Sequence, residues 1–133
     1  MTPGGERTLL QAAVALVCIV PFGASLTGIL LGAAWLQPAP AIDLDSHFRY
    51  LSGLFLGMGN AFASCVPSIE RKTERFRLLG MMVVLGGLAR LWSLVTLGPP
   101  STGHAVGLCI ELIVVPLLLA WQARVARRLR LPG

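Results

Sequence analysis

The sequence predicts an all-α membrane protein, a four-helix up-down bundle that crosses a bilayer four times with both termini in the cytoplasm. Hydrophobic residues make up 55% of the 133 residues and charged residues only 13%, about half the charged share of soluble domains. Four apolar stretches reach the roughly 20 residues that a bilayer core requires. The basic residues gather in clusters between these stretches, which is typical of membrane topology signals.

The four predicted helices cover residues 9–36, 48–66, 78–97 and 104–123 of a single integral membrane domain, residues 1–133. The first stretch carries no formal charge. It is far longer than the apolar part of a cleavable signal peptide, which has about 7–15 residues. We therefore expect this stretch to be retained as a helix.

Basic residues set the predicted orientation. They follow the second and fourth stretches, as Arg71, Lys72, Arg75 and Arg77 and then as Arg124, Arg127, Arg128 and Arg130. The loop after the first stretch carries Asp43 and Asp45 instead. The positive-inside rule then places both termini and the middle loop in the cytoplasm of a bacterial inner membrane. Because the net charge of +5 lies in these clusters, we expect membrane lipids as partners and no nucleic acid.

Three charges interrupt the apolar stretches, where each needs a partner or a purpose. Arg90 lies seven residues before the end of the third stretch, and Glu111 lies seven residues after the start of the fourth. A short loop joins these two stretches, so antiparallel helices place both charges about 10 Å below the outer surface. We predict that they pair. Arg49, near the outer end of the second stretch, is a third candidate member of this polar cluster.

Small residues accompany these charges at helical spacing. In the second stretch Gly53, Gly57 and Asn60 follow Arg49, and we include Asn60 in the polar cluster. Gly86 and Gly87 precede Arg90, and Gly107 precedes Glu111 by one turn; with Gly53 and Gly57 they are the predicted helix-packing residues. Small side chains let helix backbones approach closely. The charges are therefore expected to face the inside of the bundle.

Metal binding has weak support from the outer loops. Asp43, Asp45 and His47 alternate there, and His104 opens the fourth stretch; such side chains bind divalent metals. Alternating acids before a helix more often act as N-caps and interact with the helix dipole. We therefore expect no metal site, with Asp45 or Ser46 as the N-cap.

Two interpretations of the polar cluster remain open. It is either a buried ion pair that fixes helix order, or the polar centre of an outer-leaflet pocket for a lipid-like or quinone-like ligand. No motif for a cofactor or a catalytic triad is present, so a non-enzymatic protein is favoured. The alternatives are an accessory subunit of a larger membrane complex, a homo-oligomer, and a small lipid enzyme that uses Glu111 as an acid or base.

Several short motifs make the chain resemble a bacterial family known only as a domain of unknown function, DUF4345. The marks are residues 48–53 (FRYLSG), 86–90 (GGLAR), 98–99 (GP), 111–112 (EL) and Pro116. The resemblance covers about residues 43–124 and leaves out the first helix. It implies four inner-membrane helices and points to Arg49, Arg90 and Glu111 as family marks. It implies no activity.

Overall fold

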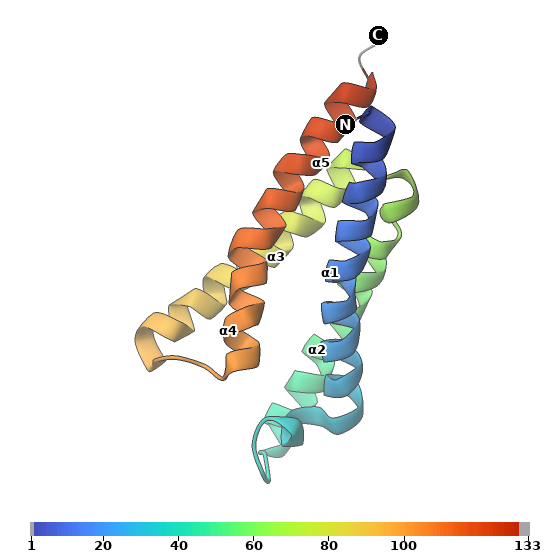
Figure 1. Cartoon of the computed structure of the whole chain (residues 1–133). Coiled ribbons are helices and arrows are strands. Elements are labelled where there is room, and N and C mark those ends of the chain that lie inside the picture. The colour runs from blue at the N-terminus through green and yellow to red at the C-terminus, as the bar shows by residue number, and fades with distance from the viewer. Residues whose placement is uncertain (1, 131–133) are drawn as a thin grey trace. The chain divides into compact units, whose positions relative to one another are not determined.

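The computed structural model describes residues 2–130, and its regular elements are all helical (Figure 1). Its main helices are α1 (Pro3–Leu31), α2 (Ile42–Ala63), α3 (Thr73–Leu97), α4 (Thr102–Cys109) and α5 (Val115–Arg130). Three short turns, η1 (Gly32–Trp35), η2 (Val66–Ser68) and η3 (Ile110–Val114), extend or join them. Because α4, η3 and α5 follow one another without a break, residues 2–130 form four long helices. The predicted all-α class and helix count are confirmed; residues 1 and 131–133 of the predicted domain lie outside the described residues.

Each long helix begins before the apolar stretch that predicted it, whereas the first ends at Trp35 and α2 ends at Ala63, before the predicted residues 36 and 66. The starts carry residues that suit a first turn, Pro3 and Glu6 in α1 and Glu74 in α3. Proline is favoured at the first helical position, and carboxylates interact with the positive end of the helix dipole. The α5 helix continues to Arg130, and its last turn contains basic residues, which interact favourably with the negative end of the helix dipole. Counting apolar residues alone therefore places the helix starts too late, and it extends α2 past its actual end.

Three of the helices are long and apolar enough to cross a membrane: residues 3–35, 73–97 and 102–130. They indicate a multi-pass membrane protein. The α2 helix has 22 residues, enough for a crossing, yet it is not one of these three candidates. The polar side chains of His47, Arg49 and Asn60 lower its mean hydropathy.

The chain divides into two compact units, which we call the hairpin unit (Gln11–Val66) and the terminal unit (Met1–Leu10 with Pro67–Gly133). In the hairpin unit α1 and α2 run antiparallel. At one end Gln11 Nε2 donates a 2.7 Å hydrogen bond to the Val66 carbonyl. Near the other end a Cβ added at Gly28 would collide with Ser52 Oγ. Glycine at position 28 therefore lets the two helices come close together.

In the terminal unit α3 runs antiparallel to the helix formed by α4, η3 and α5. Gln122 Nε2 donates to Thr73 Oγ1 over 3.0 Å where α3 begins. Further along, a Cβ at Gly80 would lie 2.5 Å from Leu119 Cδ2, and one at Gly87 would lie 2.8 Å from Leu112 Cδ2. Glycines thus form the side of α3 that faces its neighbour.

The η3 segment is a single π-helical turn within the fourth helix. The amide of Val115 donates to the carbonyl of Ile110, five residues earlier, and Pro116 follows directly. A proline has no N–H and its ring collides with the carbonyl four residues before it. A wide turn relieves this crowding without ending the helix, and such turns are frequent at functional sites. Glu111 lies in this turn.

The neighbouring glycines Gly86 and Gly87 allow a matched test of the α3 contact. A Cβ at Gly87 would also lie 2.9 Å from Glu111 Cβ, whereas one at Gly86 meets nothing within 4 Å. We expect Gly87→Ala to lower the free energy of unfolding by about 1–3 kcal/mol through overpacking. Gly86→Ala should be neutral, or stabilising by up to about 1 kcal/mol through helix propensity. Unfolding in detergent followed by circular dichroism measures both, and equal effects would contradict this packing.

Candidate functional site

Arg90 and Glu111 lie next to each other between α3 and η3, as their matched positions predicted. Arg90 Nε is 3.2 Å from Glu111 Oε2. The Glu111 side chain is 13% exposed and that of Arg90 is 35% exposed. The carboxylate is therefore the more enclosed partner, and about a third of the Arg90 side chain remains accessible.

Small residues allow the two charges to meet. Gly87 lies one turn before Arg90, and a Cβ there would press on the backbone side of Glu111. Gly107 lies one turn before Glu111, and a Cβ there would be 3.7 Å from Arg90 Nη1. Two of the predicted packing glycines thus flank this ion pair.

The pair is not fully satisfied. Glu111 Oε2 is buried and accepts no hydrogen bond from residues 2–130, although it lies within ion-pair distance of Arg90. A buried carboxylate oxygen without a hydrogen bond is costly, because its desolvation is incompletely compensated. Chemically, the site offers an acceptor oxygen and a guanidinium with donors to spare. It can engage one polar group from a ligand.

Arg49 has a different set of contacts, all within the hairpin unit. Its Nε lies 2.8 Å from Asp45 Oδ2, and its Nη1 donates to the carbonyls of Ile29 and Leu30 at the end of α1. The last carbonyls of a helix lack intrahelical partners. Arg49 therefore completes the end of α1, and its predicted membership of a cluster with the charges of α3 and η3 stays a prediction.

Asp45 makes the remaining contacts between α2 and the end of α1, and we call these contacts of Asp45 and Arg49 the Asp45 closure. Its Oδ1 accepts a 2.8 Å hydrogen bond from the amide of Ala33 in η1, and a Cβ at Gly32, which has φ +63°, would collide with the same oxygen. The expectation that Asp45 or Ser46 caps α2 is wrong. The helix begins earlier, with Ala41 at the N-cap and no side-chain cap hydrogen bond, and Asp45 instead binds the backbone of η1.

The other predicted residues have local contacts or none. Asn60 donates to the carbonyl of Leu56 in its own helix. A Cβ at Gly53, Gly57 or Gly86 would meet no atom within 4 Å, so their role in helix packing stays a prediction.

The weak metal candidates are similarly dispersed. His104 Nδ1 lies 2.9 Å from Ser101 Oγ, and Asp45 is paired as described above. No group of three or more His, Cys, Asp or Glu side chains among residues 2–130 is placed to hold a metal ion, which leaves Asp43 and His47 without such a set.

Glu6 is the ionisable residue that the sequence analysis missed. It is 4% exposed, with Arg124 Nε 3.2 Å from its Oε1 and Arg128 Nη1 2.9 Å from its Oε2. The two arginines are four residues apart on one face of α5. A buried salt bridge thus joins the start of α1 to the end of α5. A single acid beside Arg7, just before the first apolar stretch, was the available signal.

Comparison with known proteins identifies a family and no activity. The sequence profile described as "Domain of unknown function (DUF4345)" matches residues 9–122, which is most of the chain. The match includes Arg49, Arg90 and Glu111 and excludes Glu6 and its two arginine partners. No curated protein and no solved structure matches the chain.

The Asp45 closure generates a pH prediction. The hydrogen bond from Arg49, and then that from the Ala33 amide, lowers the pKa of Asp45 below its ordinary value of 3.8. A lowered pKa gives a stabilisation that is complete above the ordinary value and is lost as pH falls through the folded-state pKa. The stability difference between the natural protein and Asp45→Asn should therefore be constant at neutral pH and shrink in acid.

Unfolding both proteins in detergent, from neutral pH down to acid, measures the stability difference between them. The titration of the other carboxylates cancels in this difference because both proteins share those groups. A carboxyl NMR titration of Asp45 gives an independent check. A midpoint at or above 3.8 would contradict the closure.

Proposed function

This chain belongs to the DUF4345 family, a domain of unknown function, and we propose that it is a small, non-enzymatic inner-membrane protein that binds a lipid-like or quinone-like ligand at Arg90 and Glu111. The observation that carries this proposal is the incomplete pairing of Glu111 Oε2, a buried oxygen that accepts no hydrogen bond from residues 2–130. A purely structural ion pair would be expected to use its acceptors fully.

The chemistry of the pair favours a ligand with a small polar head on an apolar body. The guanidinium of Arg90 has donors for a carbonyl or phosphate oxygen, and the carboxylate accepts from a hydroxyl group. The side chains around this level of α3 are apolar and exposed, among them Leu88 and Trp92 at 49% and 71% exposure. Such a surface suits acyl or isoprenoid chains.

Four crossings with both ends in the cytoplasm form part of the proposal. The antiparallel course of α2 along α1 supports a return crossing by α2, because α1 is itself a candidate span. The salt bridges from Glu6 to Arg124 and Arg128 hold the start of α1 against the end of α5. Both helix ends then lie on the same side of the membrane, which favours an even number of crossings. The basic clusters support the cytoplasmic side for these ends.

Sandwich fusions of alkaline phosphatase, which is active only outside the cytoplasm, test this topology. We expect activity for fusions at residues 39 and 100 and no activity for fusions at residue 70 and at the C-terminus. A green fluorescent protein fusion at the C-terminus should fluoresce and serves as the complementary control. Phosphatase activity at residue 70 would mean that α2 does not cross.

An accessory subunit is the second candidate function, and one feature of α3 favours it. Met81, Leu85, Leu88, Trp92 and Val95 are all at least 49% exposed. Their spacing of three and four residues places them on one face of the helix. Such a stripe suits a neighbouring transmembrane helix, from a larger complex or from a second copy of this chain, as well as it suits lipid.

A charge exchange separates the ligand site from a purely structural pair. Arg90→Met should reduce the co-purifying ligand by about tenfold or more, the worth of one charge-assisted hydrogen bond. The double variant Arg90→Glu/Glu111→Arg should recover most of the stability lost in either single reversal but should not recover the ligand. Quantitative mass spectrometry of lipids and proteins from mild detergent measures both the ligand and any partner chain.

Each outcome selects one function. Ligand recovery in the exchanged variant, or no enriched small molecule in the natural protein, would overturn the ligand site. A stoichiometric protein partner would favour the accessory subunit. A change in cellular lipid composition caused by Glu111→Gln would favour the alternative of a lipid enzyme with Glu111 as its acid or base.

A further inference from the structure

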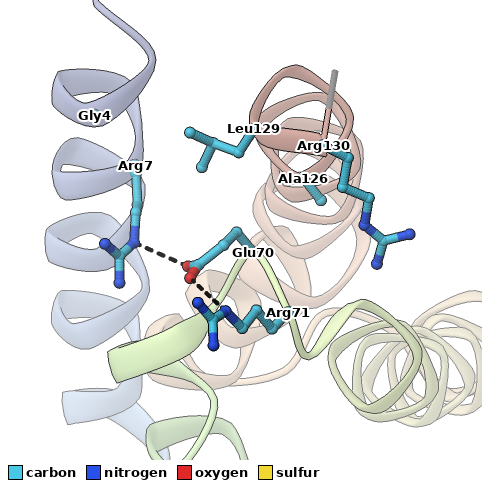
Figure 2. Close-up of a pocket in the computed structure, with 7 residues that line it drawn as sticks. All are labelled: Gly4, Arg7, Glu70, Arg71, Ala126, Leu129 and Arg130. Carbon is cyan, nitrogen blue, oxygen red and sulfur yellow. Dashed lines mark ion pairs between the residues drawn. The ribbon is translucent and has the colours of Figure 1, made fainter. Parts of the chain in front are cut away.

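A cavity of about 440 Å³ lies in the terminal unit, at the far end of α3 from the Arg90–Glu111 pair (Figure 2). Its lining includes Arg7, Glu70, Arg71, Ala126, Leu129 and Arg130. This volume falls within the range of small-molecule pockets, about 300–1,000 Å³. We propose that the cavity binds the phosphate group of an anionic phospholipid head group.

Glu70 holds two guanidinium groups close together at this cavity, as Figure 2 shows. Its Oε2 lies 2.9 Å from Arg7 Nε and its Oε1 lies 3.7 Å from Arg71 Nε. Without this carboxylate the two cations would repel each other. Glu70 is therefore a positioning residue that places two arginines where one phosphate can reach both.

The arginines keep donors for a ligand. The Arg71 side chain is 85% exposed, and its Nε lies 3.7 Å from Glu70 Oε1, which is too long for a hydrogen bond. Arg7 Nε is buried against Glu70 Oε2 without an aligned hydrogen bond, and Arg7 Nη2 donates a 2.9 Å hydrogen bond to the Pro67 carbonyl. Planar guanidinium groups bind phosphate through paired N–H donors. The exposed guanidinium of Arg71 can supply such a pair, and Arg7 can add a donor from its Nη1 group.

The charge of the lining favours an anion. Three arginines and one carboxylate line the cavity, which gives the lining a net charge of +2. Figure 2 shows the Arg130 side chain pointing away from Glu70, so it adds to the positive potential without direct contact. We therefore assign the phosphate to Arg7 and Arg71.

The depth and the apolar wall of the cavity select a lipid over a soluble phosphate. Ala126 and Leu129 lie about 4–9 Å along the helix beyond residue 123, where the fourth apolar stretch ends, which corresponds to the head-group layer. Leu129 forms an apolar side of the cavity (Figure 2). Basic pockets between membrane helices at the cytoplasmic face are suited to anionic head groups.

This inference rests on the membrane placement in the proposed function but not on a ligand at Arg90. The test uses the full-length protein in mild detergent, titrated with phosphatidylglycerol and, separately, with phosphatidylcholine of the same acyl chains. Native mass spectrometry counts the bound lipids. We expect the natural protein to prefer phosphatidylglycerol, and Arg90→Met to retain that preference even where it loses the outer ligand.

Matched variants separate a built site from general attraction to a basic surface. Arg71→Met should weaken phosphatidylglycerol binding about fivefold, the typical worth of one arginine near anionic lipid. Arg75→Met removes the same charge four residues further along the chain, at a position outside the cavity lining. This variant should change the affinity less than twofold. Equal losses in the two variants would overturn the proposal.

A third variant fills the cavity without changing its charge. Gly4 lines the cavity one turn before Arg7, and a Cβ there meets nothing within 4 Å. Gly4→Leu should retain helicity by circular dichroism and lose the preference for phosphatidylglycerol. Unchanged lipid binding by this folded variant would overturn the proposal. Displacement of the lipid by inorganic phosphate at equal concentration would do so too, because it would identify a soluble anion as the occupant.

Discussion

Charged side chains among apolar helices are costly unless they are paired, because hydrocarbon cannot solvate them. This constraint organises both units. In the terminal unit Glu111 meets Arg90, and Glu6 meets Arg124 and Arg128. In the hairpin unit Asp45 meets Arg49 and both bind the end of α1. Each set of contacts links two helices, because Asp45 and Arg49 bind from α2 to the end of α1, Arg90 links α3 to η3, and Glu6 links α1 to α5.

The three pairings differ in what they leave unused. Asp45 and Arg49 use their polar atoms on each other and on the backbone of residues 29–33, and their role is structural closure. Glu6 uses both oxygens on the two arginines. Glu111 alone among these carboxylates keeps a buried oxygen without a hydrogen bond from residues 2–130. That difference, and not charge in a membrane as such, is why the ligand site is proposed at Glu111.

Hydropathy and residue counting predicted the four helices, because length and apolar content follow directly from bilayer thickness. They also predicted the contact between Arg90 and Glu111, because two antiparallel helices joined by a short loop fix the depth of each residue. The bounds of the helices were less predictable. Polar turns before residues 9, 48 and 78 continue the helices, and apolar counting does not detect them.

The missed contacts have physical reasons too. Asp45 and Arg49 have the four-residue spacing of a helical ion pair, but the interpretation of Asp45 as an N-cap placed it outside the helix. Glu6 meets partners more than a hundred residues away in the sequence, and no local pattern indicates which basic cluster it will join. The cavity at Glu70 likewise depends on three segments that only the tertiary structure brings together.

The wide turn at residues 110–114 has one more consequence for the main chain. In a regular helix the amides of residues 115 and 116 would donate to the carbonyls of Glu111 and Leu112. Here the Val115 amide goes to Ile110, and Pro116 has no N–H to give. The carbonyl oxygens of Glu111 and Leu112 therefore lose their regular amide donors within a candidate span. They lie beside Glu111 Oε2, which also accepts no hydrogen bond from residues 2–130. Water or a hydroxyl group can supply what these oxygens miss, and an aliphatic chain cannot.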